Sequence, residues 1–252
     1  MGYDEILKLL TVDCKDDGSQ FTVTDRVDNL KSLLDESDYT LAYEGKLALV
    51  YVHKELADIS EAEVLISSHI DTVYERLFCE EGCDDMWLGT FDNSATNAAI
   101  VEMMLNKELP HSAIIAFTGD EEHDSAGAYE VMDYLYDNCI EPKMAIVTDV
   151  TNVGWEEEAE FTIENDNDID ILTGFNIVNT IIGEEYQCSF KHNAEPDETW
   201  DYIQGIEGGC SPIPCLSVCM PAGGELHGEE GVFLRKSSVK PYQAMIKKIT
   251  EL

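Results

Sequence analysis

The sequence predicts an α/β fold, a three-layer sandwich in which helices cover both faces of a mixed, largely parallel sheet. The chain has 252 residues, of which 44% are hydrophobic, enough for one substantial core. Short runs rich in valine, isoleucine and alanine alternate with helix-like stretches along most of its length. No repeat and no Pro/Gly/Ser-rich linker divides it, so we expect residues 1–252 to form a single domain.

The predicted elements follow one another as strands, loops and helices. Stretches with apolar residues at three- and four-residue spacing indicate helices, and compact apolar runs indicate buried strands. The middle of the chain is rich in acids and asparagine, and there we expect one short strand, an exposed loop and one helix. In chain order the expected elements are Thr24–Leu34 (helix), Leu47–Val52 (strand), Val64–Ser68 (strand), Ser94–Leu105 (helix), Ala113–Phe117 (strand), Ala126–Tyr136 (helix), Met144–Thr148 (strand), Phe161–Ile163 (strand), Gly174–Ile182 (helix) and Ser237–Ile249 (helix, capped by Ser237 or Ser238).

The charge is strongly negative, with 52 Asp and Glu against 15 Lys and Arg and a formal net charge of -37. Such a chain repels nucleic acid and anionic membranes, so neither is an expected partner. Most of these acids are expected to form a solvated surface. No apolar run approaches the roughly 20 residues of a membrane helix, and the N-terminus is acidic where a secretory signal would be basic. We therefore expect a cytoplasmic protein, with its eight cysteines as reduced thiols.

Potential metal ligands fall just past the predicted strands. In an open α/β sheet the loops at the carboxyl ends of the strands converge on one crevice, so these residues are expected to meet. Imidazole and carboxylate are ligands that zinc accepts, and two histidines with three carboxylates suffice for two metals if one carboxylate bridges. Cobalt or manganese suits the same donors. The candidates are His69, Asp71, Asp92, Glu121, Glu122, Asp149 and His227.

Two neighbouring pairs have further expected roles. His69 and Asp71 lie on the same side of an extended segment, so Asp71 is placed to accept the second imidazole N–H of His69 and fix its orientation. Glu121 and Glu122 point in different directions, so one can bind a metal while the other stays free as a general base.

Together these segments resemble the di-zinc exopeptidase superfamily of aminopeptidases, carboxypeptidases and aminoacylases. The matching stations run in order from about residue 60 to the C-terminus, and five in sequence are far more specific than any one. They are Ser68-His69-Ile70-Asp71, Gly89-Thr90-Phe91-Asp92-Asn93, Thr118-Gly119-Asp120-Glu121-Glu122, Asp149 and Gly224-Glu225-Leu226-His227.

The resemblance implies a role for each residue. His69 and Asp149 would bind one metal, Glu122 and His227 the other, and Asp92 would bridge both. Glu121 would be the general base and Asp71 the partner of His69. The implied cofactor is two zinc ions per chain.

The resemblance implies hydrolysis of a terminal amide bond in a small peptide or amino-acid-derived substrate. His69 and Asp92 are too close in sequence for an inserted lid domain, which matches the minimal form of the superfamily. The acidic field favours amine-bearing substrates and hence an aminopeptidase. Carboxypeptidase and N-acyl-amino-acid deacylase activities stay open, as does the choice between monomer and homo-oligomer.

Several alternatives compete with these assignments. Acids are so common here that any one is more often surface charge than ligand, and Asp166, Asp168 and Asp170 are substitutes for Asp149. The same fold would also serve a metal-binding pseudoenzyme or scaffold, because fold does not fix function. No expected ligand or base is missing from the sequence, which favours the enzyme.

Overall fold

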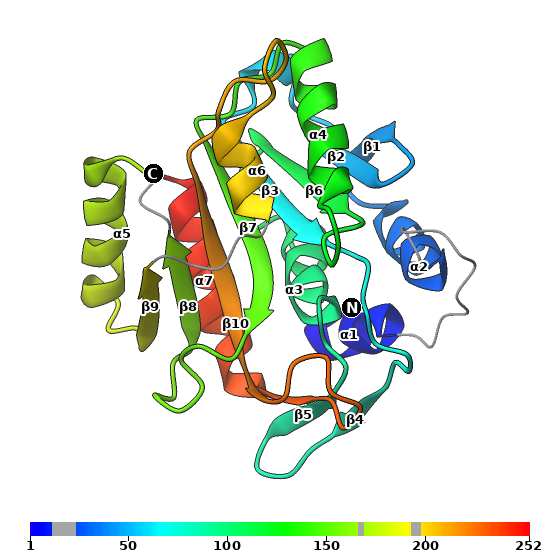
Figure 1. Cartoon of the computed structure of the whole chain (residues 1–252), viewed down its shortest axis with the longest axis vertical. Helices are drawn as coiled ribbons and strands as arrows, with labels where there is room; N and C mark the ends of the chain where they lie inside the picture. Colours follow the sequence, from blue (N-terminus) through cyan, green and yellow to red (C-terminus); the bar gives the residue numbers. More distant parts are fainter. Residues whose placement is uncertain (12–23, 166–168, 193–197) are drawn as a thin grey trace.

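A mixed sheet forms the centre of the fold in the computed structural model, which describes residues 1–11, 24–165, 169–192 and 198–252 (Figure 1). The strands within these residues are β1 (Tyr39–Glu44), β2 (Ala48–His53), β3 (Val64–His69), β4 (Cys79–Glu81), β5 (Met86–Gly89), β6 (Ala113–Thr118), β7 (Met144–Thr151), β8 (Phe161–Asn165), β9 (Cys188–His192), β10 (Cys215–Gly224) and β11 (Val232–Arg235). The helices are α1 (Tyr3–Leu10), α2 (Thr24–Leu34), α3 (Ser94–Leu105), α4 (Ala126–Asp137), α5 (Ile171–Gly183), α6 (Glu198–Gln204) and α7 (Val239–Thr250).

The middle of the sheet is parallel. Strands β6, β3, β7 and β10 lie side by side in that order, each parallel to the next. Antiparallel pairing begins at the flanks, where β2 joins β6 and β8 joins β10. The end of β10 also pairs with β11, which continues through β5 to β4. The carboxyl ends of the four central strands therefore open onto one edge of the sheet.

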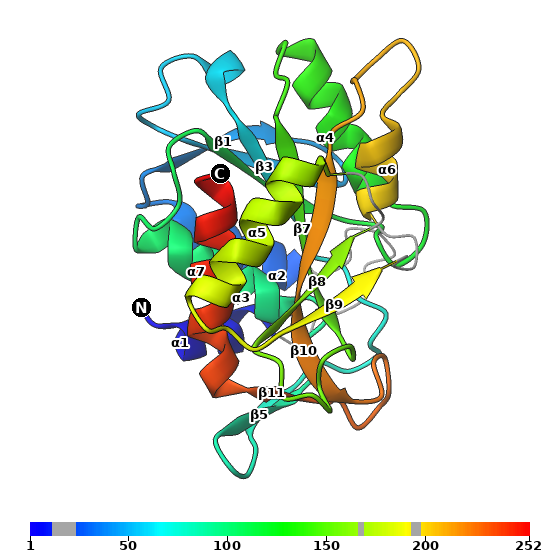
Figure 2. The ribbon, with the colours of Figure 1, turned by 90° about the vertical axis from the view of Figure 1, so that its left-hand side faces the viewer.

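Helices cover both faces of this sheet, as Figures 1 and 2 show. Alternate strand residues point to opposite faces. Leu49 and Tyr51 of β2 belong to one apolar cluster, which also contains residues of α1, α2, α3, α5 and α7. Ala48 and Val50 belong to the other, with residues of α4 and α6. The predicted three-layer α/β fold with a mixed sheet is thus confirmed.

Each predicted strand and helix is present, with ends that differ by a few residues. The main departure is β10, a strand that is not among the expected elements and that ends in Gly223 and Gly224. A glycine is required there because a Cβ on Gly223 would lie 2.1 Å from the Trp155 ring. The glycines thus reflect a close approach to a tryptophan within a strand. Short polar strands such as β9 were also missed because they lack a continuous apolar run.

The cysteines of the described segments form no disulfide. Across the same segments, every helix is too short or too polar to traverse a lipid bilayer.

Candidate metal centre

His69 is the last residue of β3, and the chain leaves the sheet through Ile70 and Asp71. This exit is held by Arg26 of α2, a fully buried side chain. Its Nη1 donates to the carbonyl oxygen of Ile70 at 2.8 Å and lies 3.4 Å from that of Asp71. Asn97 Nδ2 donates to the carbonyl oxygen of His69 at 2.8 Å. These bonds fix the backbone at His69 and at the two residues that follow it.

Asp92 lies in the loop between β5 and α3. The Asp92–Asn93 peptide bond is cis. Asn93 Nδ2 donates to the carbonyl oxygen of Thr148 in β7 at 2.7 Å, which ties the loop to the centre of the sheet. Asp92 is thereby placed between the ends of β3 and β7.

Glu121 and Glu122 lie in a tight turn between β6 and α4. The turn begins at Asp120, which has a positive φ of 67° and accepts hydrogen bonds at its carbonyl oxygen from the N–H groups of Asp124 and Ser125. The turn ends near Gly127. A residue with a side chain would not fit there, because its Cβ would lie 2.5 Å from the carbonyl oxygen of Gly119. The turn holds the two glutamates side by side with their carboxylates facing different neighbours.

The other two candidates come from β7 and from the turn after β10. Asp149 is part of β7, which continues to Thr151. The Oδ1 atom of Asp149 accepts a hydrogen bond from the N–H of Val150 at 2.7 Å. His227 has a positive φ of 64°. Its N–H donates to Tyr74 Oη at 3.1 Å, and the two rings meet edge to face. Tyr74 therefore orients the His227 turn.

Asp92 is the centre of the cluster. Its Oδ1 lies 3.0 Å from Nε2 of His69, and its Oδ2 lies 2.9 Å from Nε2 of His227. One carboxylate thus faces two imidazoles with two different oxygens.

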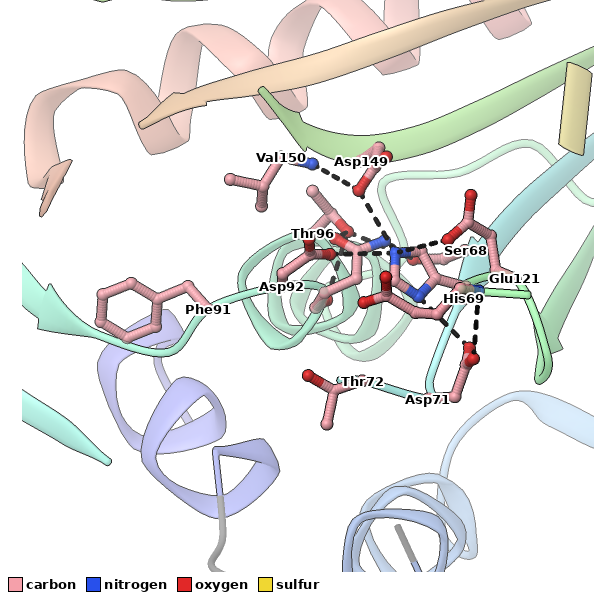
Figure 3. Close-up of polar contacts among 12 residues, drawn as sticks. Ser68, His69, Asp71, Thr72, Phe91, Asp92, Thr96, Glu121, Asp149 and Val150 are labelled. Carbon is pink, nitrogen blue, oxygen red and sulfur yellow. Dashed lines mark hydrogen bonds and ion pairs between the residues drawn. The ribbon is translucent and has the colours of Figure 1, made fainter. Parts of the chain in front are cut away.

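The remaining carboxylates divide between the same two imidazoles. Asp149 Oδ1 lies 3.3 Å and Glu121 Oε2 3.9 Å from His69 Nε2 (Figure 3). Glu122 Oε2 lies 3.5 Å from His227 Nε2. On the other side of the His69 ring, Nδ1 lies 3.3 Å from Asp71 Oδ1, and Asp71 Oδ2 accepts from the N–H of Glu122 at 3.3 Å.

Burial and crowding shift the ionisation of these groups. Burial, with the charge of nearby Asp149 adding to it, raises the pKa of Glu121 to about 9. Burial and the charge of Asp92 raise the pKa of Asp149 to about 7. Burial alone would also raise the pKa of Asp92, but hydrogen bonds from His227 and His69 hold it well below its usual range. A buried site this rich in carboxylates is one that bound cations would stabilise.

The donors fit a divalent metal. His69, Asp92 and Glu122 each offer one ligand atom, and these atoms lie within 4.8 Å of one another. Glu122 Oε1 is buried and has no hydrogen-bond partner within the described residues. Imidazole nitrogen and carboxylate oxygen are zinc ligands, and such an orphaned oxygen is what a cation would satisfy.

All seven candidate residues from the sequence come together at this edge of the sheet. Among the substitutes for Asp149, Asp166 and Asp168 lie outside the described residues. Asp170 is elsewhere, as the cap of α5, where its Oδ1 accepts from the N–H groups of Leu172 and Thr173. Of Asp149 and Asp170, the two of these residues that the structure describes, Asp149 is therefore the one that contacts His69.

Two residues of the neighbourhood are not among the candidates from the sequence. Tyr74 is one. The other is Glu198 of α6, which is fully buried and accepts from Ser67 Oγ at 2.7 Å. Burial raises its pKa to about 7, against the hydrogen bond from Ser67 and the charge of His69. Ser67 and His69 share one face of β3, so Glu198 lies beneath the cluster.

A second group of possible ligands, His53, Glu55 and His111, lies at the end of β2. The two imidazole rings stack at a centroid distance of 3.9 Å with 6° between their planes. The nitrogen lone pairs lie in the planes of the rings. Because the two planes are nearly parallel, these lone pairs do not converge on one ion. We assign no metal to this group.

Comparison with known proteins shows which fold this chain shares with solved structures. No protein-family model and no curated protein sequence matches this chain. Among solved structures, a TET aminopeptidase from a marine sediment archaeon of the Thaumarchaeota aligns with a TM-score of 0.75 and 10% identity, over 98% of this chain and 95% of that one. The TET1 peptidase of Pyrococcus horikoshii aligns with a TM-score of 0.71 and 11% identity, over 99% of each chain. The LapA aminopeptidase of Legionella pneumophila aligns with a TM-score of 0.68 and 16% identity, over 99% of this chain and 70% of that one. The chain therefore has the fold of these peptidases.

Proposed function

We propose that residues 1–252 form one catalytic domain that hydrolyses the terminal amide bond of a small peptide, with two metal ions and a glutamate base. Aminopeptidase activity is favoured. The observation that carries the proposal is the position of Asp92, whose two oxygens face the imidazoles of His69 and His227 at 3.0 and 2.9 Å. A carboxylate between two histidines, each with a further carboxylate beside it, matches the donors of a two-metal site.

The residues divide into two ligand sets around Asp92. His69 with Asp149 would hold one ion, and His227 with Glu122 the other. Zinc suits these nitrogen and oxygen donors, and cobalt or manganese suits them as well. Two such ions would act as Lewis acids, polarising the substrate carbonyl and acidifying the attacking water.

The remaining two acids have other roles: Asp71 orients His69, and Glu121 transfers a proton. Asp71 faces Nδ1 of His69 and keeps Nε2 directed toward Asp92. Glu121 Oε2 lies 3.9 Å from His69 Nε2, farther than the oxygens of Asp92 and Asp149 at 3.0 and 3.3 Å, which favours a role beside the ligands rather than among them. Bound cations beside it would lower the raised pKa of Glu121, and the ionised carboxylate would then take the proton of the attacking water and pass it to the leaving amine.

The open side of the cluster and the charge of the chain favour an amine-bearing substrate. The His227 side chain is 45% exposed and that of Asp149 is 24% exposed, whereas His69 is buried. A substrate therefore approaches past His227 and Asp149. The net charge of -37 attracts a free α-amino group and repels a free carboxylate. The aminopeptidases with the same fold support this choice.

The test is hydrolysis of a matched set of amides by protein stripped with chelator and by the same protein reloaded with zinc. The set contains a free-amine aminoacyl amide, an N-blocked dipeptide with a free carboxylate, and an N-acyl amino acid. We expect the reloaded protein to cleave the free-amine substrate fastest and the stripped protein to cleave none. A preference for either of the other two would replace the aminopeptidase assignment. Loaded protein that cleaves none of the three would overturn the proposal.

A further inference from the structure

Helix α5 carries a large exposed apolar surface. Its 13 residues, Ile171–Gly183, include no Asp, Glu, Lys or Arg, although 27% of the chain consists of those four types. Only Ile177 and Ile181 of this helix are buried. Ile171 is 87% exposed and Phe175 63%, and Leu172, Val178 and Ile182 are exposed as well. Contiguous apolar surface of this kind marks an interaction site.

The exposed face continues onto the end of the sheet. A groove of about 870 Å³ runs between α5 and strands β8 and β9, lined by Ile163, Ile169, Phe175, Val178 and Phe190. Phe190 of β9 is 53% exposed. Figure 2 views the molecule from this side, with α5, β8 and β9 toward the reader. Phe190 and α5 thus form one apolar surface, here named the α5–β9 face.

Strand β9 is also an edge of the sheet that the described residues form. Within the described residues it pairs with one strand only, β8. An edge strand beside an apolar surface can receive a strand from another chain.

We propose that the α5–β9 face is the interface of a homodimer. Two copies related by a twofold axis perpendicular to the sheet would place their β9 strands side by side and antiparallel. That axis keeps both α5 helices on the same side of the joined sheet. Phe175 and Phe190 of each copy would then be covered by apolar residues of the other.

The lack of charged side chains on α5 favours a second copy as the partner. Each chain carries -37, so two copies that met through acidic surfaces would bring many like charges together. Because α5 itself carries no charged side chain, two such chains meet there with less repulsion than through acidic surfaces. A basic protein would be drawn to the acidic surface instead of an uncharged helix, and an anionic membrane would repel the whole chain.

The experiment measures the mass of the full chain in solution by sedimentation velocity and light scattering, from micromolar to millimolar concentration. Phe175→Glu and Leu172→Glu add a charge to exposed positions of the α5–β9 face. Tyr136→Glu is the matched control, because Tyr136 of α4 is 53% exposed and lies outside the face. Phe175→Ser removes the ring without adding charge, in case the glutamate variant fails to fold. Circular dichroism checks each variant.

We expect wild type and Tyr136→Glu to be dimeric, with the dimer strengthened by added salt, and the two glutamate variants to be monomeric. Phe175→Ser should raise the dimer Kd at least tenfold. A wild type that stays monomeric over the whole range overturns the proposal, and so does a dimer that persists unchanged in all the α5 variants. Flotation of monomeric wild type with phosphatidylcholine vesicles would also overturn it, in favour of a lipid surface.

Discussion

Glu121 and Glu122, adjacent in the chain, face different histidines. Glu121 Oε2 lies 3.9 Å from His69 Nε2, and Glu122 Oε2 lies 3.5 Å from His227 Nε2. The turn from Asp120 holds both carboxylates at the cluster while separating their surroundings. One of the pair can therefore bind a metal and the other can move a proton.

Replacing Glu121 by glutamine should abolish proton transfer and leave the metals in place. Glutamine keeps the shape of the side chain but cannot take a proton from the attacking water. We expect kcat to fall by roughly 10²- to 10⁴-fold, with a smaller change in KM, because that is what positioned proton transfer usually contributes. Steady-state kinetics and elemental analysis of the same preparation measure both quantities.

The neighbouring variant Glu122→Gln is the matched control, since it makes the same chemical change one position away. It should lose metal as well as activity. If Glu121→Gln is depleted of metal, or is loaded and fully active, the base has been assigned to the wrong residue.

Metal content tests the shared position of Asp92. The wild type should hold about two ions per chain after zinc reconstitution and lose activity in chelator. Asp92→Ala should empty or disturb both positions, because its two oxygens face both histidines. His227→Ala should chiefly weaken one. Titration with zinc, followed by elemental analysis, would count against a bridging Asp92 if the two variants lost metal equally.

The central elements of the fold were predictable because their residues are buried on both sides. Ile66 lies in β3, which begins with the apolar run Val64–Ile66, and Ala116 lies in β6, which is apolar from Ala113 to Phe117. Buried runs of that kind stand out in any sequence. Strand β9 reads Cys-Ser-Phe-Lys-His and is exposed at alternate positions, so it resembles a loop. Its pairing with β8 is a tertiary contact that local sequence does not encode.

The candidate site was predictable as a set of residues for a related reason. His69 and Asp149 each lie at or near the carboxyl end of a recognisable parallel strand, and a parallel sheet brings such ends together. Asp92 comes just before the recognisable helix Ser94–Leu105. Glu198 and Tyr74 were not chosen as candidates because each reaches the cluster by tertiary packing from outside the five matching segments. In a chain with 52 acids, Glu198 is indistinguishable from surface charge until its burial is known.

Added salt should stabilise the protein, because a net charge of -37 makes the folded chain repel itself. The Debye length falls from about 30 Å at 0.01 M salt to about 8 Å at 0.15 M. We expect the free energy of unfolding by urea to rise over this range, at constant metal loading. Sucrose at matched osmolality is the control for effects other than screening. A free energy that is unchanged or lower in salt would show that self-repulsion is not what limits stability.

Glu198 should make the metal-free protein lose stability as the pH rises. Burial raises its pKa from 4.5 to about 7 in the folded state, so its neutral form is the one that folding favours. The resulting stabilisation is complete below about pH 4.5 and is lost as the pH rises through about 7.

The variant Glu198→Gln stays neutral at every pH and still offers an oxygen to Ser67 Oγ. The difference in free energy of unfolding between this variant and wild type should therefore change with pH. It should favour the variant by about 3 kcal/mol more at pH 8 than at pH 4.5, which is the equivalent of a pKa shift from 4.5 to about 7. Urea unfolding in chelator at the two pH values measures this difference. Glu36→Gln, at an exposed position, removes the same charge and should change the two values nearly equally. If Glu198→Gln behaves like Glu36→Gln, Glu198 is ionised at pH 8 without penalty, and its carboxylate must be solvated or paired in the folded protein.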